Sequence, residues 1–237
     1  RTYIMGILNV TPDSFSDGGK FNDLERAVQH AKEMIDDGAD IIDVGGESTR
    51  PNHTPVSEEE EINRVIPIIK ELRKHFDIPI SIDTYKGKVA ELSIEAGANL
   101  INDVWGFKKD PYIAEVAAKY DVSCCLMHNR DNTEYKNFIE DMLKDLQESV
   151  DIALRAGVKK ENIILDPGIG FAKTYEQNLE AMNNLERLSE LGYPVLLGTS
   201  RKSMIGNALN LPSNERVEGT VATTVIGIMK NCDFVRV

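Results

Sequence analysis

Short apolar runs rich in Ile, Val and Leu recur along the whole chain. They lack the alternation of polar and apolar residues that a half-exposed strand carries. Unbroken hydrophobicity of this kind is typical of strands that are buried on both faces of a parallel sheet. We therefore predict eight strands, at residues 3–8, 41–44, 78–82, 100–104, 122–127, 163–165, 195–197 and 234–237.

Helical patterns with clear ends separate these runs. Two capping boxes, Ser57 with Glu60 and Thr174 with Gln177, predict where two of the helices begin. Apolar residues at helical spacing over residues 23–37 predict a helix that covers a sheet. A glycine follows the end of four amphipathic runs, at Gly38, Gly97, Gly157 and Gly192.

Eight strands that alternate with helices over 237 residues match an α/β (β/α)8 TIM barrel. A doubly wound open sheet uses the same alternation and is the alternative. No linker interrupts the pattern, so we expect residues 1–237 to form a single domain. The sequence ends in the eighth strand without an eighth helix. We therefore expect that it is truncated at the C-terminus and that the natural protein continues beyond Val237.

The chain has 39 acidic and 27 basic residues and a net charge of −12. Nucleic-acid binding needs clustered Lys and Arg, which occur here only as isolated doublets, so we expect no nucleic-acid partner. No run approaches the roughly 18 apolar residues of a membrane helix, and no basic-then-apolar leader opens the chain. We expect no membrane partner and a cytoplasmic location. Three cysteines are too few for a disulfide framework, and we expect them to be buried and reduced.

Polar residues lie near the end of every predicted strand or directly after it. In a TIM barrel the active site is built where the strands end, so these positions carry the candidate chemistry. They are Asn9 and residues 11–14, residues 45–50, Asp83, Asn102 and Asp103, residues 128–130, residues 166–168, residues 199–203 and Arg236. Among the four histidines only His128 ends a strand, and no pair of histidines has the spacing of a zinc site.

Three of these strand-end side chains are Asp83, Asn102 and Asp166. Taken alone, either aspartate is more typical of a helix N-cap, and Pro167 with Gly168 is typical of a turn. Two carboxylates and an amide at one end of a barrel are harder to explain by structure, because a buried charge is costly unless something pairs with it. A ligand with a row of N–H donors would pair with them.

The loop at residues 198–203 supplies two adjacent cations and several hydroxyls where a strand meets a helix N-terminus. A solvated basic loop would have the same composition. Together with Arg50 and Arg236, however, the loop favours a diphosphate ligand over a single carboxylate. The spacing of a Walker loop is missing. Asn9 offers an oxygen to Mg²⁺, which takes few protein ligands and completes its shell with water and phosphate.

Several strand-end segments resemble the signatures of the dihydropteroate synthase family, in the same order and over the whole chain. Residues 5–19, MGILNVTPDSFSDGG, resemble the first signature, and residues 43–51, DVGGESTRP, resemble the second. The other matching segments are residues 81–84 (SIDT), 102–104 (NDV), 165–171 (LDPGIGF), 200–203 (SRKS) and 235–237 (VRV).

The resemblance implies a transferase of folate biosynthesis. Such an enzyme joins 6-hydroxymethyl-7,8-dihydropterin diphosphate to p-aminobenzoate and forms 7,8-dihydropteroate and diphosphate. It implies that diphosphate leaves first and that the arylamine then attacks. It further implies Mg²⁺ as cofactor with Asn9 as its ligand, competition by sulfonamides for the p-aminobenzoate site, and a homodimer.

The resemblance also implies a role for each residue that matches the family pattern. The pterin would be bound by Asp83, Asn102, Asp166 and Lys202, and the diphosphate by Asn9, Arg50, Ser203 and Arg236. The p-aminobenzoate would be bound by Thr49, Pro51, Phe171, Lys202 and Ser203. The catalytic residues would be Asp83, Lys202 and Arg236.

Two further expectations concern segments around this site. The loops at residues 13–19 and 49–55 are rich in Gly, Pro and Ser, and we expect them to close over the site. The family pattern continues after Val237 with a histidine that helps to bind diphosphate. A late apolar row would serve a dimer contact or, as is more common, face the sheet: Val217, Val221, Val225 and Ile228.

Two other functions would use similar residues. Some pterin-binding barrels transfer a methyl group from methyltetrahydrofolate. That substrate carries no diphosphate, so the diphosphate-binding candidates Asn9, Arg50 and residues 200–203 argue against that reaction. A non-catalytic pterin-binding paralogue is the second alternative. The presence of both Lys202 and Arg236, together with the strand-end aspartates, argues against it.

Overall fold

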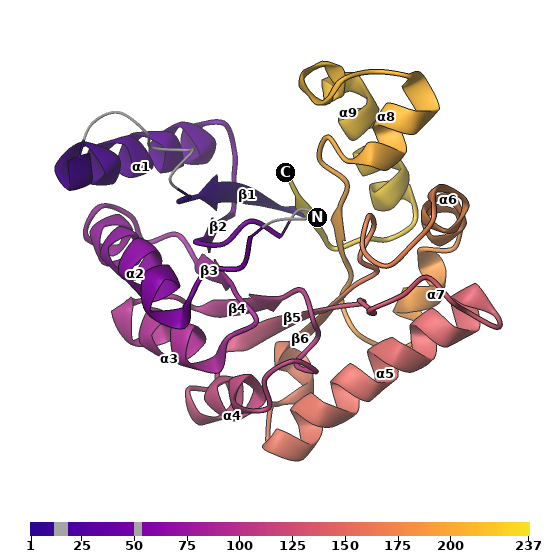
Figure 1. The fold of residues 1–237 in the computed structure, drawn as a ribbon, viewed down its shortest axis with the longest axis horizontal. Helices are drawn as coiled ribbons and strands as arrows, with labels where there is room; N and C mark the ends of the chain where they lie inside the picture. The colour runs from indigo at the N-terminus through magenta and orange to yellow at the C-terminus, as the bar shows by residue number, and fades with distance from the viewer. Residues whose placement is uncertain (12–18, 50–53) are drawn as a thin grey trace.

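Eight parallel strands form the centre of the molecule in the computed structural model, which describes residues 1–11, 19–49 and 54–237 (Figure 1). Their bounds are β1 Tyr3–Asn9, β2 Ile41–Gly45, β3 Ile80–Asp83, β4 Leu100–Asp103, β5 Ser123–Met127, β6 Ile163–Asp166, β7 Leu196–Gly198 and β8 Phe234–Arg236. Each lies within a predicted run or extends it by one residue, so the eight predicted strands are confirmed.

The strands form a ring. Hydrogen bonds join them in the order β6-β5-β4-β3-β2-β1-β8-β7. A parallel bridge between Leu165 and Val195, with the N–H of Leu165 donating to the carbonyl of Pro194 at 2.9 Å, connects the two ends of that order. The predicted TIM barrel is therefore confirmed, and the doubly wound open sheet is wrong.

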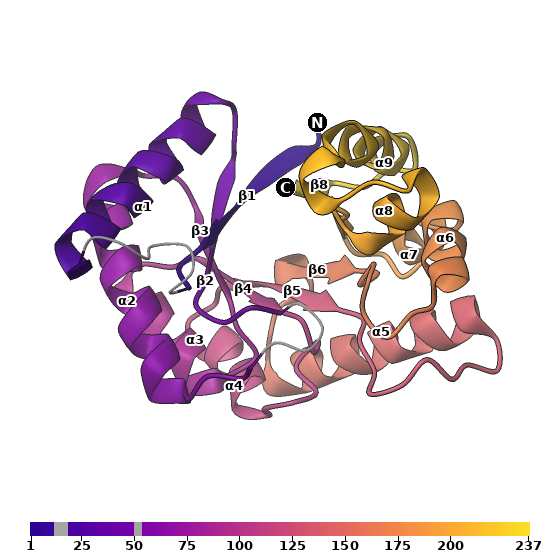
Figure 2. The same cartoon turned by 45° about the horizontal axis from the view of Figure 1, so that its top comes forward.

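The connecting helices lie on the outside of this ring (Figures 1 and 2). Their bounds are α1 Gly19–Asp36, α2 Glu58–His75, α3 Gly87–Ala96, α4 Tyr112–Lys119, α5 Phe138–Ala156, α6 Tyr175–Asn183, α7 Glu186–Ser189, α8 Ser203–Leu209 and α9 Val217–Met229. Across the described ranges, none of the helices combines the length and apolar character that a membrane crossing requires.

The two predicted capping boxes differ in how fully they form. At α6, Thr174 and Gln177 make both reciprocal hydrogen bonds. At α2, the N–H of Glu60 donates to Oγ of Ser57 at 3.1 Å, while the Glu60 carboxylate pairs with Arg64 one turn on. That competing ion pair explains why the second half of the box is replaced at α2.

The apolar side chains form two cores. The smaller fills the inside of the barrel and consists of Met5, Ile41, Leu100, Cys125, Ile164 and Leu196, with Phe234 packed against it. The larger lies between the barrel and the helices and contains Cys124. Adjacent strand residues point to opposite faces, which places the neighbours Cys124 and Cys125 in different cores. All three cysteines are buried and free. Because apolar side chains fill the inside of the barrel, the groups that can bind a ligand lie at the strand ends above them.

Helix α9 differs from its predicted packing. Val217, Val221, Val225 and Ile228 expose 46%, 57%, 48% and 46% of their surface, so the expectation that this row faces the sheet is wrong. Gly227 is buried instead, and a Cβ there would lie only 2.5 Å from Cδ2 of Leu197. Because α9 is apolar on most of its faces, its sequence gives little indication of which face packs inward.

Candidate active site

Five polar side chains lie directly above the apolar core of the barrel, and we call them the inner polar layer: Asp43, Asp83, Asn102, Asp166 and Arg236. Every second residue of a strand points to the same side. Four members follow an inner-core residue by two positions, after Ile41, Leu100, Ile164 and Phe234 respectively. Asp83 pairs in register with Asn102 on the neighbouring strand. The alternation that fills the barrel therefore also directs these groups inward where the strands end.

Arg236 connects two carboxylates of the inner polar layer. Its Nε donates to Oδ2 of Asp43 at 2.7 Å, and its Nη2 donates to Oδ2 of Asp83 at 2.9 Å. The side-chain amide of Asn102 donates to the same Asp43 oxygen at 3.1 Å. One cation thus faces two buried carboxylates, and the cluster is negative when both are ionised.

The Asp83 carboxyl is close to its titration point at neutral pH. Burial raises its pKa to about 7, the nearby Asp43 adds to that rise, and Arg236 opposes it. Oδ1 of Asp83 and Oδ1 of Asp43 are buried and accept no hydrogen bond from the described part of the chain. Leaving a buried acceptor unpaired costs free energy. Both atoms are therefore suited to accept N–H groups from a ligand.

Asp166 and Lys202 form the other half of the site. The N–H of Gly168 donates to Oδ1 of Asp166 at 2.7 Å. The Lys202 ammonium donates to the carbonyl of Ile169 and lies 5.0 Å from the centroid of the Phe171 ring. Burial raises the pKa of Asp166 and lowers that of Lys202 to about 8, and the attraction between the two ions opposes both shifts. A buried carboxylate, a cation and an aromatic face are thus brought together.

Asn9 lies at the rim of the site, at the end of β1 and in register with Gly45. A Cβ on Gly45 would lie 3.7 Å from Oδ1 of Asn9 and 3.7 Å from Oδ2 of Asp83. The glycine therefore leaves open the space that these two oxygens share.

Four predicted site residues come from the loops around the rim. Thr49 is half-buried after β2, and Ser203 is exposed as the first residue of α8. Arg50 and Pro51 lie outside the described residues, as do most of the two loops that we expect to close over the site. The structure therefore brings together the strand-end residues, and the role of each predicted site residue stays a prediction.

The site offers oxygen atoms of the kind that bind Mg²⁺. In the parts of the chain that the structure describes, no three His, Cys, Asp or Glu side chains are grouped as a metal site. Mg²⁺ does not need such a group, because it commonly takes one or two protein oxygens and completes its shell with water and substrate phosphates. The amide oxygen of Asn9, exposed at the rim, fits that kind of site.

Two features of this region were not predicted from the sequence. Asp43 was not among the predicted site residues, although its position two residues after the inward-facing Ile41 marks it as inward-facing too. His128 was noted only as a strand end. In the structure it is buried, with Nε2 2.9 Å from Oδ2 of Asp145 and Nδ1 2.8 Å from Nζ of Lys173. No spacing in the sequence indicates that second network.

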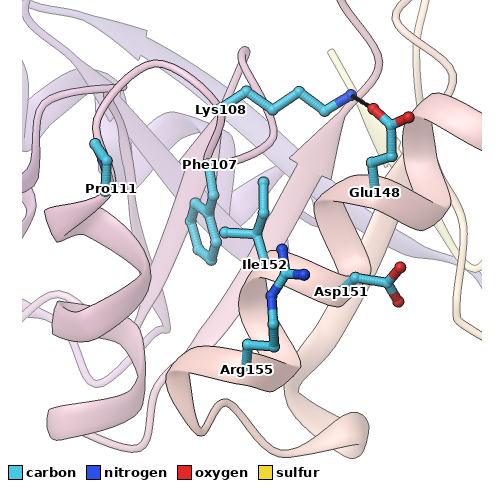
Figure 3. Close-up of a pocket in the computed structure, with 7 residues that line it drawn as sticks. All are labelled: Phe107, Lys108, Pro111, Glu148, Asp151, Ile152 and Arg155. Atoms are coloured by element: carbon cyan, nitrogen blue, oxygen red, sulfur yellow. Dashed lines mark hydrogen bonds and ion pairs between the residues drawn. The ribbon is translucent and has the colours of Figure 1, made fainter.

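Two surface hollows lie apart from the inner polar layer. One, of about 490 Å³, lies between α5 and the loop that joins β4 to α4. Nζ of Lys108 lies 3.2 Å from Oε2 of Glu148 there, and Figure 3 shows the two side chains directed toward each other. The other is lined by residues of the loops after β4 and β5, including Trp105 and Arg130. Neither hollow is lined by a member of the inner polar layer, so the end of the barrel remains the candidate active site.

Comparison with known proteins identifies the family of this chain. A family model described as "Pterin binding enzyme" matches residues 5–237. A dihydropteroate synthase of Clostridium beijerinckii is 79% identical over 238 residues, which is 100% of this chain and 88% of the relative. The chain belongs to the dihydropteroate synthase family. The resemblance found in the sequence is therefore confirmed.

Solved structures of dihydropteroate synthases have the same fold. One from Clostridium difficile, determined in the presence of pteroic acid, has a TM-score of 0.97 and 58% identity, and the match covers 100% of this chain and 90% of that one. One from Yersinia pestis with a sulfonamide drug has a TM-score of 0.93 and 43% identity, with 100% and 88% covered. Dihydropteroate synthases are transferases of folate biosynthesis, and the chain is accordingly an enzyme of this class.

Proposed function

We propose that the chain condenses 6-hydroxymethyl-7,8-dihydropterin diphosphate with p-aminobenzoate to give 7,8-dihydropteroate and diphosphate. One observation carries the proposal. Oδ1 of Asp43 and Oδ1 of Asp83 are buried acceptors without a partner in the described residues, at the bottom of a barrel end that also holds Asn102, Asp166 and Lys202. A flat heterocycle with several N–H donors satisfies such a set.

The pterin ring matches the inner polar layer in its hydrogen-bonding groups. Its amino group and ring N–H groups are donors, and Asp83 and Asp166 would accept them in charge-assisted hydrogen bonds. Asn102 and Lys202 would donate to the ring's acceptor atoms. Asp43 would act in two ways, because its Oδ2 accepts from both Arg236 and Asn102 and fixes their orientation, while its buried Oδ1 is left to accept from the ligand.

The reaction breaks the bond between the pterin methylene and the diphosphate, whose oxygen keeps the electron pair. The methylene becomes electron-poor, and the carboxylate of Asp83 would stabilise that positive charge. The arylamine nitrogen then bonds to the methylene and releases a proton. Preorganised charges of this kind are often the largest contribution to catalysis. Asp83 and Lys202 would be catalytic residues because they contact the reacting pterin.

The departing diphosphate would be bound by Asn9, Arg50, Ser203 and Arg236. Arg236 uses two of its five N–H groups on Asp43 and Asp83, which leaves three for an anion. Mg²⁺, held through Asn9, would neutralise charge on the diphosphate when bound. Loss of activity with a chelator and recovery with added Mg²⁺ is the expected result.

The p-aminobenzoate would bind where Lys202 lies over the Phe171 ring. Its carboxylate suits Lys202 and Ser203, and its ring suits Phe171 with Thr49 and Pro51. A sulfonamide carries a similar arylamine and would compete here. The sulfonamide complex of the Yersinia pestis relative supports this part of the proposal.

A homodimer is also part of the proposal. Helix α9 exposes an apolar row at Val217, Val221, Val225 and Ile228, and burial of such a row against a second copy would remove it from water. A cytoplasmic location stays a prediction.

The test of the proposed function is an assay of dihydropteroate and diphosphate formation from both substrates with Mg²⁺. The unchanged chain should form the two products in equal amounts. Asp83→Asn and Lys202→Ala should each lower kcat/KM by about 100-fold or more, whereas the exposed Asp77→Asn and Lys159→Ala should not. Tight binding of a pterin without any product would instead support the non-catalytic paralogue.

A further inference from the structure

Lys173 directs its ammonium back into the loop that carries Asp166 and Phe171. It immediately precedes the N-cap of α6. Its Nζ donates to the carbonyl of Gly168 at 2.9 Å, to the carbonyl of Phe171 at 2.9 Å and to Nδ1 of His128 at 2.8 Å. An ammonium group has three protons, so these contacts use all of them.

A second set of contacts holds the imidazole that Lys173 binds. Because Nδ1 of His128 accepts from the ammonium, Nε2 carries the ring proton and donates to Oδ2 of Asp145 at 2.9 Å. Burial lowers the pKa of His128 to about 4, which keeps the ring neutral. Arg130 donates to the same carboxylate, from Nε at 2.5 Å and from Nη2 at 3.2 Å. His128 is therefore fixed in one orientation and one tautomer.

The loop from residue 166 to residue 172 depends on such contacts because side chains donate to four of its carbonyl groups. Backbone N–H groups donate to two, since the carbonyl of Asp166 accepts from His128 at 2.9 Å and that of Gly168 from Phe171 at 3.0 Å. Lys202 donates to the carbonyl of Ile169, and the Tyr135 hydroxyl donates to the carbonyl of Ala172 at 2.7 Å. Lys173 binds two more of these carbonyls. Its removal would leave the carbonyl of Phe171 without its side-chain donor. The carbonyl of Gly168 would keep, among the described residues, the N–H of Phe171 at 3.0 Å.

The same loop packs closely on the end of β5. Gly168 has a φ of +70°, and a Cβ on it would lie 2.1 Å from the carbonyl oxygen of His128. The backbone at Gly168 can approach His128 so closely only because glycine has no side chain. The loop is thus held in one conformation from the β5 side and by Lys173.

We propose that Lys173 is a positioning residue of the active site, which holds residues 166–172 in the conformation that presents Asp166 to the pterin and Phe171 to p-aminobenzoate. The inference rests on the proposed function. Lys173 acts through the loop and not on a substrate, because its three protons are engaged by the loop and by His128. Burial lowers the pKa of Lys173 to about 7 against the attraction of Asp166, so its charge depends on the acceptors around it.

The test compares three variants of the full chain. Lys173→Met removes the donors and keeps the length of the side chain, and Lys173→Arg keeps the charge. Ile113→Val removes a buried methyl group from α4, outside the inner polar layer, and controls for a small loss of stability. The measurements are the Kd of pteroic acid, kcat and KM for p-aminobenzoate, and the unfolding midpoint.

Lys173→Met should raise the Kd and the KM by about tenfold or more while kcat stays within about threefold of the unchanged chain. Lys173→Arg should recover part of the lost affinity, and Ile113→Val should leave Kd and KM unchanged. Lys173→Met with Kd and KM within about threefold of the unchanged chain would overturn the proposal. An equal rise in Ile113→Val would also overturn it, since lost stability would then explain the effect.

A second variant covers the case in which Lys173→Met does not fold. Tyr135→Phe removes one hydrogen bond to the same loop, so it should raise the Kd of pteroic acid by about threefold or more. An unchanged Kd would overturn the proposal. Failure of the proposed function would be recognised separately, because the unchanged chain would then form no dihydropteroate. The positioning role rests on that function and would then be rejected as well.

Discussion

Arg236 on β8 and Asp83 on β3 form an ion pair of 2.9 Å although they are 153 positions apart in the sequence and two strands lie between them in the barrel. The pair exists because side chains from all strands of the barrel converge at the same end. Asp43 shares the guanidinium at 2.7 Å. Burial raises the pKa of Asp83 most, and these contacts across the barrel then adjust it, since Arg236 lowers the pKa and Asp43 raises it.

Replacing Arg236 by Gln should leave two buried carboxyl groups without their cation. Breaking a buried ion pair costs about 3–5 kcal/mol, so the free energy of unfolding should fall by about that amount at pH 8. The fall should be smaller at pH 5, where Asp83 takes up a proton. Chemical denaturation at the two pH values measures both. Arg155→Gln, at an exposed position of α5, is the control, and equal stability of the two variants at pH 8 would contradict the prediction.

The raised pKa of Asp83 predicts opposite effects of pH on stability and on binding. The folded-state pKa is about 7 against an ordinary value of 3.8, so the stability that Asp83 contributes at acidic pH is lost as the pH rises from 3.8 to about 7. Ligand N–H groups favour the carboxylate. The affinity for pteroic acid should therefore rise with pH up to about 7, and binding below that pH should release a proton.

Titration calorimetry at pH 6 in two buffers of different ionisation enthalpy measures this release. The unchanged chain should give different heats in the two buffers, and Asp83→Asn should give more similar ones. Equal heats for the unchanged chain would mean that no proton leaves on binding and that Asp83 is already ionised.

The sequence predicted much of this site because a barrel places strand ends together. Asp83 and Asp166 were identified because each directly follows an apolar run, and Asn102 because it and Asp103 form a polar pair near the end of the predicted strand at 100–104. Asp43 was missed because it lies inside such a run, where only the inward or outward direction of its neighbours shows its role. The pairing of Asp43 with Arg236 joins residues 193 positions apart. No spacing in the sequence predicts that contact.

Other features depend on packing that the sequence leaves open. Lys173 precedes a capped helix, and its sequence context describes a helix start rather than a side chain that turns back into the preceding loop. Helix α9 is apolar on most faces, so periodicity gave no reliable choice between a sheet-facing and an exposed row. In both cases the deciding information is which neighbouring element approaches, and that is a property of the folded chain.

Gly168→Ala should destabilise the loop that carries Asp166. The new Cβ would lie 2.1 Å from the carbonyl oxygen of His128, in addition to the strain of a φ of +70°. Gly192→Ala is the matched control, because Gly192 has a φ of +83° but its Cβ would meet only Nζ of Lys160 at 3.7 Å. Gly168→Ala should lose about 1 kcal/mol or more of unfolding free energy beyond the control, and only it should bind pteroic acid more weakly. Equal behaviour of the two variants would contradict the predicted clash.

Val221→Glu should dissociate the proposed homodimer. The side chain is 57% exposed on α9, so a charge there is tolerated in the monomer and is costly in an apolar contact. Sedimentation equilibrium should give a dimer for the unchanged chain and a monomer for the variant. Leu154→Glu, at a 41% exposed position of α5, should leave the dimer intact. A Val221→Glu variant that stays dimeric would exclude α9 from the interface.

The most direct test of the account is the Kd of pteroic acid for the unchanged chain, for Asp83→Asn and for Asp77→Asn, a control at an exposed aspartate just before β3. Hydrogen bonds to a charged group contribute about 1.5–3 kcal/mol, so Asp83→Asn should raise the Kd by about 10- to 100-fold, while Asp77→Asn should not change it. Equal Kd values for all three proteins would contradict the claim that the inner polar layer binds the pterin.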